Sequence, residues 1–180
     1  MALDRLEFQT TRWFNAEAPP TPESLTGKVV ALHAFQMLCP GCVSHGLPQA
    51  QRIAKLFSPE RVAVIGLHTV FEHHDVMTPD ALEAFIHEYQ LTFPIGVDQP
   101  SDKGDIPRSM AAYAMRGTPS LLLFDRDGRL RWHEFGRPED MAVGAQIAQL
   151  VGEPAAGTGE VATGSGKVDC DDEGCAAPAR

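Results

Sequence analysis

The stretch "FQMLCPGCVSHGLPQ", residues Phe35–Gln49, places two cysteines three positions apart at a change of local structure. The run before it, "KVVALHAF" (Lys28–Phe35), is short and mostly apolar and follows the turn signal "LTGK", which is typical of a buried strand. From Pro40 to Phe57 apolar residues recur at helical spacing. Cys39 is therefore predicted to lie directly after a strand and at the start of a helix.

A helix start is a favourable place for a reactive cysteine. Free backbone N–H groups and the positive end of the helix dipole favour a thiolate over a thiol. Pro40 falls near the first helical position, where its missing N–H has no cost. We expect Cys42 to lie about one turn further on and to be more buried. The pattern predicts that Cys39 attacks a disulfide or an oxidant and that Cys42 resolves the mixed disulfide.

Two other uses of the pair stay open at this point. A zinc site needs four ligands, and the second cysteine pair of the chain, Cys170 and Cys175, could supply the missing two. A purely structural disulfide is less expected in an intracellular protein.

Composition narrows the class of protein. The chain has 180 residues, 43% of them apolar, and a formal net charge of −9, which argues against nucleic acid or an anionic membrane as the main partner. Residues 1–20 lack the basic start and apolar run of a signal peptide, and no later segment approaches the roughly 18 apolar residues of a membrane span. We therefore expect a cytoplasmic protein, where a close cysteine pair is usually catalytic or metal-binding.

The chain divides into three parts. Residues 24–152 are predicted to form one redox domain, preceded by an N-terminal extension over 1–23. From residue 153 to 180 there is no aromatic side chain, while glycines and acidic residues are frequent. Such a segment cannot bury enough surface to offset its ordering entropy, so we expect a flexible acidic tail that carries Cys170 and Cys175.

Strands and helices are predicted to alternate through the domain. Asp127-Gly128, for example, joins two apolar runs, which is a strong hairpin signal. After the first strand and helix we expect a strand over 61–70, a helix over 79–90, a strand near 93–97, a helix around 108–115, a hairpin over 120–135 and a last helix ending near 151. This order predicts an α/β fold with a central mixed β-sheet flanked by helices on both faces.

A second motif lies about 80 residues after the cysteines. In "RGTPSLLLF", Thr118-Pro119 stands immediately before an apolar strand. A proline at a strand start can be a simple edge device. Its functional interpretation is a cis peptide that brings the Thr118 backbone beside the dithiol, where it can pair with the extended chain of a substrate.

Cys-Pro-Gly-Cys between a strand and a helix, followed by Gly-Thr-Pro before a hairpin, resembles the thioredoxin superfamily over roughly residues 24–152. The sequence is most similar to its TlpA-like and redoxin branch. The resemblance implies a thioredoxin-like fold, Cys39 as nucleophile, Cys42 as resolving thiol and Pro119 as the cis-proline. It also implies protein or small-molecule disulfides and thiols as substrates, a reductase as partner, and no cofactor.

The chain departs from the family pattern at three positions. Leu38 stands where a tryptophan is usual, Pro48 falls one residue later than is common, and His33 replaces a buried Asp or Asn. The simplest interpretation of His33 is a core histidine bonded to backbone. The alternative is that its imidazole, titrating near neutral pH, relays the Cys42 proton.

A group of histidines raises the question of a metal. His68, His73, His74 and Asp75 follow a predicted strand, so we expect them at the carboxyl end of the sheet near the dithiol. With Cys39 and Cys42 they could hold copper or zinc, as Sco-type relatives hold copper. A substrate-facing or electrostatic role is the other possibility, and no metal is our first expectation.

Two further hypotheses concern the cysteines. Peroxiredoxins carry a Pro-x-x-x-Thr-x-x-Cys pattern, and Leu32 and Gln36 stand at its first two positions here, so a redoxin-type thiol peroxidase is only an alternative. The tail sequence "CDDEGC" suggests a relay, in which Cys170 and Cys175 exchange electrons with Cys39–Cys42 at a high effective concentration. The sequence thus predicts a thiol–disulfide oxidoreductase.

Overall fold

A six-stranded sheet forms the centre of the protein. The structure is a computed structural model that describes residues 3–154, 170–171 and 174–175. The strands of this sheet are β1 (Thr10–Phe14), β2 (Val29–Phe35), β3 (Val62–His68), β4 (Ile95–Asp98), β5 (Ser120–Phe124) and β6 (Leu130–Phe135).

The strand order is β1-β4-β3-β2-β5-β6, so the strand that precedes the cysteines lies inside the sheet. β2 is parallel to β3 and β3 to β4, whereas β1, β5 and β6 each pair antiparallel with their neighbours. The predicted mixed sheet is therefore confirmed. All seven residues of β2 are buried, as expected of a strand covered on both faces.

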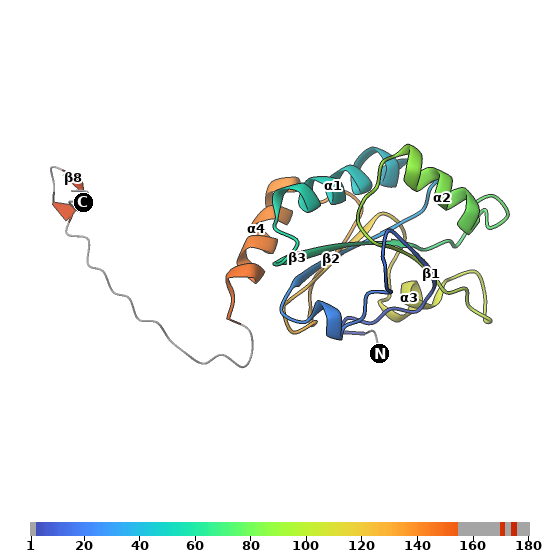
Figure 1. Cartoon of the computed structure of the whole chain (residues 1–180), viewed down its shortest axis with the longest axis horizontal. Coiled ribbons are helices and arrows are strands. Elements are labelled where there is room, and N and C mark those ends of the chain that lie inside the picture. The colour runs from blue at the N-terminus through green and yellow to red at the C-terminus, as the bar shows by residue number, and fades with distance from the viewer. Residues whose placement is uncertain (1–2, 155–169, 172–173, 176–180) are drawn as a thin grey trace.

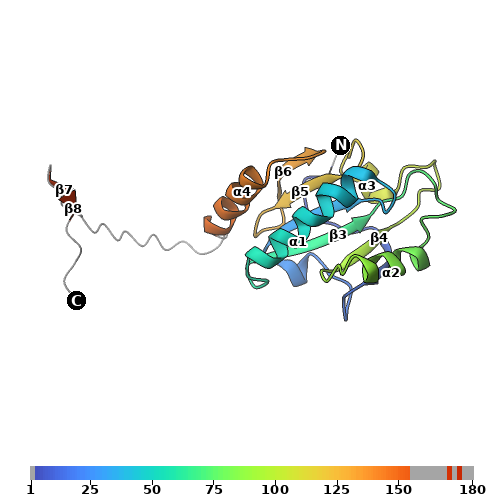
Figure 2. The ribbon, with the colours of Figure 1, turned by 90° about the horizontal axis from the view of Figure 1, so that it is seen from above.

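Helices cover both faces of the sheet (Figure 1). They are α1 (Leu47–Leu56), α2 (Pro79–Glu88), α3 (Arg108–Ala112), α4 (Asp140–Gly152) and the short 3₁₀ helix η1 (Glu23–Leu25). α1, α2 and α4 bury their apolar residues in one core cluster, and α3 and η1 pack on the cluster of the opposite face. Figure 2 shows α1 and α4 crossing the same face, where the Gln49 amide donates to Asp140 Oδ1 at 2.8 Å.

The helix that follows the cysteines begins with a π-helical segment, η2 (Cys42–Gly46), which continues into α1. The N–H of Leu47 donates to the carbonyl of Cys42, five residues earlier. Pro48 explains the wider turn, because it has no N–H to offer the carbonyl of Ser44. The sequence predicts a helix from Pro40 whose register is shifted at Pro48. In the structure this shift is the π-helical turn at Cys42–Gly46.

The domain begins before residue 24, the start that the sequence predicts. β1 pairs with β4 at the edge of the sheet, and Leu6 is buried against the α3 face. Much of the segment assigned to an N-terminal extension is therefore part of the same core. None of the helices within residues 3–154 is long and apolar enough to cross a membrane.

Two short strands are described in the C-terminal segment, β7 (Cys170–Asp171) and β8 (Gly174–Cys175). They pair antiparallel, with Cys170 opposite Cys175. The rest of the predicted acidic tail after Pro154 lies outside the described residues.

Candidate active site

The two cysteines sit where β2 gives way to the helix. The N–H of Cys39 donates to the carbonyl of Gln36 at 3.2 Å, which closes the turn after the strand. The carbonyl of Cys39 in turn accepts the N–H groups of Cys42 at 3.0 Å and Val43 at 3.1 Å. Both cysteines are free thiols; Cys39 is half-buried and Cys42 is fully buried.

The dithiol is electrostatically asymmetric. The backbone N–H of Cys42 donates to Cys39 Sγ at 3.2 Å, and this hydrogen bond strengthens when the sulfur carries a negative charge. Burial, followed by the hydrogen bond with the Cys39 thiol, raises the pKa of Cys42 to about 12. Only the sulfur of Cys39 is both near the surface and supplied with a donor.

Thr118 and Pro119 lie directly against the dithiol. The peptide bond between them is cis, and the Cys39 thiol donates to the Thr118 carbonyl at 3.5 Å. Pro119 packs on the helix at two glycines: a Cβ added at Gly41 would lie 3.2 Å from Pro119 Cδ, and one at Gly46 would lie 3.0 Å from Pro119 Cβ. The two motifs that are distant in sequence therefore form one site.

His33 lies in β2, on the face that also buries Cys42. The residue is 2% exposed, and Nε2 has no hydrogen-bond partner. Burial, with a smaller contribution from His45, lowers the pKa of His33 to about 3. The expectation of an imidazole that titrates near neutral pH is therefore wrong, because His33 stays neutral there. The backbone hydrogen bond of the simplest interpretation is not made by Nε2.

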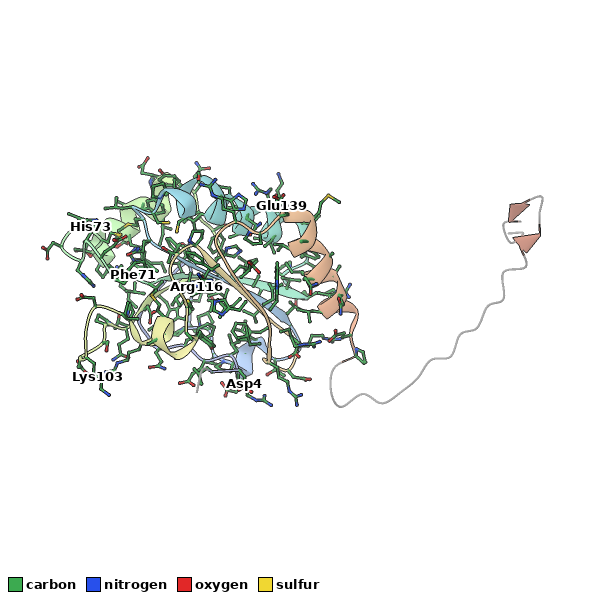
Figure 3. The ribbon with its side chains drawn as sticks, turned by 180° about the vertical axis from the view of Figure 1, so that it is seen from behind. Asp4, Phe71, His73, Lys103, Arg116 and Glu139 are labelled. Atoms are coloured by element: carbon green, nitrogen blue, oxygen red, sulfur yellow. The ribbon has the colours of Figure 1, made fainter. Side chains whose placement is uncertain are left out.

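The predicted histidine group does not assemble. His68 is buried at the end of β3, with its ring centroid 5.3 Å from that of Phe35 and both ring nitrogens without a partner. Burial lowers its pKa to about 4. His73, His74 and Asp75 are exposed in the following loop, and Figure 3 shows His73 at the outer edge of the molecule. Within residues 3–154, no three His, Cys, Asp or Glu side chains are grouped to hold a metal ion.

Gln36, which stands at a position that does not match the peroxiredoxin pattern, connects the dithiol turn to this loop. Its buried side-chain oxygen accepts the N–H of Phe71 at 3.2 Å, and its amide group donates to Glu72 at 3.4 Å. The same residue accepts the Cys39 N–H through its backbone carbonyl. A lone glutamine after a strand gives no sequence signal for such a role.

Four side chains, Leu38, Phe135, Arg116 and Arg137, form the rim of the site, and only Leu38 was considered from sequence. Leu38 is 58% exposed beside Cys39, and Phe135, at the end of β6, is 43% exposed. Arg116 lies over the Phe135 ring at 5.5 Å. Arg137 Nε is 4.0 Å from the position of a Cβ added at Gly41, between the two cysteines. These residues come from three separate segments, so spacing alone could not have grouped them.

The predicted relay residues, Cys170 and Cys175, are described only as backbone partners of β7 and β8. Their side chains lie outside the described part of the chain.

Comparisons with known proteins agree with this site. A family model described as the AhpC/TSA family matches residues 15–133. A thioredoxin-like superfamily protein of known crystal structure is 56% identical, with a TM-score of 0.83 over 86% of this chain and 99% of the other. A thiol-disulfide isomerase from Corynebacterium glutamicum is 49% identical, with a TM-score of 0.81 over 83% of this chain and 97% of the other.

A thioredoxin-like protein solved in the oxidized form, with 23% identity and a TM-score of 0.65 over 82% of this chain and 93% of the other, shares the fold. A comparison with curated proteins found no match. The family model spans well over half of the chain, and the two relatives near 50% identity cover almost all of the described domain. With its dithiol between a strand and a helix and a Thr-Pro segment against it, the chain belongs to the AhpC/TSA family of thioredoxin-like proteins.

Proposed function

We propose that the protein is a thiol–disulfide oxidoreductase in which Cys39 is the nucleophile and Cys42 the resolving thiol. The observation that carries this proposal is the hydrogen bond from the Cys42 N–H to Cys39 Sγ at 3.2 Å, next to a second sulfur that is fully buried. This arrangement gives Cys39 Sγ a hydrogen-bond donor while it attacks and holds Cys42 back until a mixed disulfide forms. Family membership and the similar thiol-disulfide isomerase support the same activity.

The reaction follows from these positions. The Cys39 thiolate attacks one sulfur of a substrate disulfide, and the other substrate sulfur leaves and takes up a proton. Cys42 then loses its proton and attacks Cys39 Sγ, which releases the second substrate thiol and leaves a Cys39–Cys42 disulfide. A reductase would return the dithiol to its reduced form. We propose net reduction, in keeping with the cytoplasmic location expected from sequence.

Reduction of insulin or of a small aromatic disulfide tests this assignment. Cys39→Ser should abolish turnover. Cys42→Ser should allow the first attack and accumulate a mixed disulfide with the substrate, visible as a mass increase that dithiothreitol removes. Turnover that persists in Cys39→Ser would reject the assignment.

His33 is the candidate acceptor for the Cys42 proton. Its unpartnered Nε2 lies on the same sheet face as Cys42, and no other buried imidazole lies in β2 within the described domain. With a pKa of about 3, His33 can accept the proton only while the sulfur–sulfur bond is forming. His33→Ala should therefore slow resolution of the mixed disulfide at every pH from 6 to 8. Equal resolution rates would remove this role.

Thiol peroxidase activity is the competing function, because the AhpC/TSA family match is also compatible with it. Two observations favour disulfide exchange. Leu32 packs on the sheet face opposite to Cys42, and the side chain of Gln36 is occupied by Phe71 and Glu72. Neither offers a peroxide a hydroxyl or a ring beside Cys39. Peroxide consumption faster than insulin reduction would make thiol peroxidase activity the better assignment.

The cysteine pair of the C-terminal segment is a candidate relay. Its support is the backbone register of β7 and β8, which sets Cys170 opposite Cys175. The relay predicts that removal of residues 153–180 slows turnover with a thioredoxin-reductase system. Unchanged turnover after that removal would exclude the relay and leave the function of Cys39 and Cys42 intact.

A further inference from the structure

The rim of the dithiol carries two arginines whose charges are not neutralised. Arg116 and Arg137 are both exposed, and neither takes part in a salt bridge among the described residues. The chain as a whole is acidic, with a net charge of −9. Two unpaired guanidinium groups beside a reactive sulfur therefore stand out against the charge of the rest of the protein.

Arg137 lies over the turn that holds the two cysteines. Its Nη2 donates to Ser44 Oγ at 3.3 Å, and its Nε lies 4.0 Å from the place of a Gly41 Cβ. Ser44 Oγ itself donates to the Pro40 carbonyl at 2.7 Å. The guanidinium is thus held close to the dithiol by a single neutral contact, and its remaining donors face solvent.

Arg116 stands two residues before Thr118 in the chain and is exposed. It lies over the Phe135 ring, and this ring packs on Gly117, where an added Cβ would meet Phe135 Cε2 at 2.9 Å. The rim therefore combines two exposed apolar side chains, Leu38 next to Cys39 in the chain and Phe135 against Gly117, with two positive charges. This surface fits an extended segment that carries acidic residues on both sides of a cysteine.

We propose that this rim binds the chain's own C-terminal cysteine segment, residues 169–175, and selects it as the redox partner of Cys39. The inference rests on the proposed function and names its partner. In "DCDDEGC" the first cysteine, Cys170, stands between Asp169 and Asp171, and two more acids, Asp172 and Glu173, follow. The acidic charges match the guanidinium groups, which recognise carboxylates through paired N–H donors.

The length of the chain permits this contact. The described domain ends at Pro154, just after α4, and α4 runs away from Gln49 of α1 over 13 residues, or about 20 Å. Residues 155–169 can span up to about 50 Å. A cysteine on such a tether meets the site at an effective concentration in the millimolar range, far above that of a free partner.

The exchange is a two-electron step with all atoms accounted for. The Cys39 thiolate attacks the sulfur of Cys170 in a Cys170–Cys175 disulfide, a Cys39–Cys170 bond forms, and Cys175 leaves as a thiolate that takes up a proton. Cys42 then gives up its proton and attacks Cys39 Sγ, which frees Cys170. The Cys170–Cys175 pair is reduced and the Cys39–Cys42 pair is oxidised.

The test uses the full chain with Cys42→Ser and Cys175→Ser, so that Cys39 and Cys170 can form one stable disulfide. Equilibration in glutathione buffers gives the effective concentration of Cys170 at Cys39. We expect an intramolecular disulfide at low ionic strength. Arg116→Gln with Arg137→Gln should lower the effective concentration about fivefold. Arg129→Gln is the control for each of the two arginine changes made singly, because it removes one positive charge from an exposed side chain at the opposite end of β5 and β6.

A double-mutant cycle tests whether the two arginines and the acidic residues interact directly. Asp169, Asp171, Asp172 and Glu173 are changed to their amides, with and without the two arginine changes. If the rim recognises the acids, the two losses are not additive, and 0.5 M salt removes the difference between wild type and the arginine variant. Equal effective concentrations in all variants would overturn the proposal, as would a disulfide that forms only between two copies. Insulin reduction by the wild-type chain is unaffected by either outcome and reports separately on the proposed function.

Discussion

The backbone N–H of Cys42 donates a hydrogen bond to the sulfur of Cys39 across 3.2 Å. The residue that supplies this donor keeps its own sulfur buried and protonated, since its pKa is raised to about 12. One residue thus stabilises the first thiolate through its backbone and delays the second attack through its side chain. Cys39 therefore attacks first, and Cys42 attacks second.

The first prediction concerns alkylation. Iodoacetamide at pH 7.5 should modify Cys39 and leave Cys42 unmodified, because only a thiolate reacts and only Cys39 is accessible. Mass spectrometry of peptides from the folded protein gives both extents. Cys42→Ser should keep the fast reaction, while modification of Cys42 at a rate comparable to that of Cys39 would contradict the asymmetry.

Gly46 provides a test of the packing that joins the two motifs. In Gly46→Ala the new Cβ would lie 3.0 Å from Pro119 Cβ, so the helix or Pro119 must move. A helix gains about 1 kcal/mol from glycine to alanine, but we expect the overlap to outweigh this gain and to lower the free energy of unfolding by about 1–2 kcal/mol. Urea unfolding measures the change, and insulin reduction should slow with it.

Gly144→Ala in α4 is the control for that change. Nothing lies within 4 Å of its added Cβ, so the helix preference acts alone and stability should rise by about 0.5–1 kcal/mol. A stability gain at both positions would show that Pro119 does not press on the helix.

The third prediction is a loss of stability in acid. The pKa values of His33 and His68 are lowered to about 3 and about 4, while the unfolded chain binds these protons near pH 6.5. Stability is therefore complete above pH 6.5 and falls as the pH drops. The loss is roughly 2–3 kcal/mol for each histidine by pH 4.5. Urea midpoints between pH 7 and pH 4.5 measure it.

Removal of both imidazoles should flatten this dependence. His33→Leu with His68→Leu is expected to lose most of the slope, whereas His74→Gln, an exposed position, keeps it. Burial raises the pKa of Asp98, which acts in the opposite direction but equally in every variant. A slope that is the same in the double variant and wild type would contradict the assignment.

Gln36→Leu tests the link between the dithiol turn and the histidine loop. Leucine leaves the Phe71 N–H without its acceptor, and the free energy of unfolding should fall by about 1–2 kcal/mol. Hydrogen exchange at the Phe71 amide should speed up about tenfold, which corresponds to about 1.4 kcal/mol of local opening. The Thr69 amide, bonded to the Phe35 carbonyl, is an internal control and should not change.

The sequence predicts most of the sheet because its central strands are continuous apolar runs. The predicted strands over 28–35 and 61–70 become Val29–Phe35 and Val62–His68, within three residues at each end. The helix over 79–90 begins as predicted, with Thr78 Oγ1 accepting the Ala81 N–H. β1 escaped prediction because "TTRWF" buries only its last residue and lacks an alternating pattern.

The site could be predicted only where a motif marks it. Cys39, Cys42, Thr118 and Pro119 belong to two motifs with a clear local meaning, and the structure brings them together. The protonation of His33 could not be predicted, since it depends on complete burial that a sequence does not measure. Arg116 and Arg137 also carry no local signal, because their position follows from the pairing of β5 with β6.

The widened turn at residues 42–46 holds one residue more than a regular helix would need. The extra residue is taken up within this turn, so the residues on either side keep the faces that they would have in a regular helix. Cys42 at the start of the turn and Leu47 and Ala50 after it are therefore all buried in the same core. Burial of the second thiol thus depends on the spacing of the chain as well as on the identity of its neighbours.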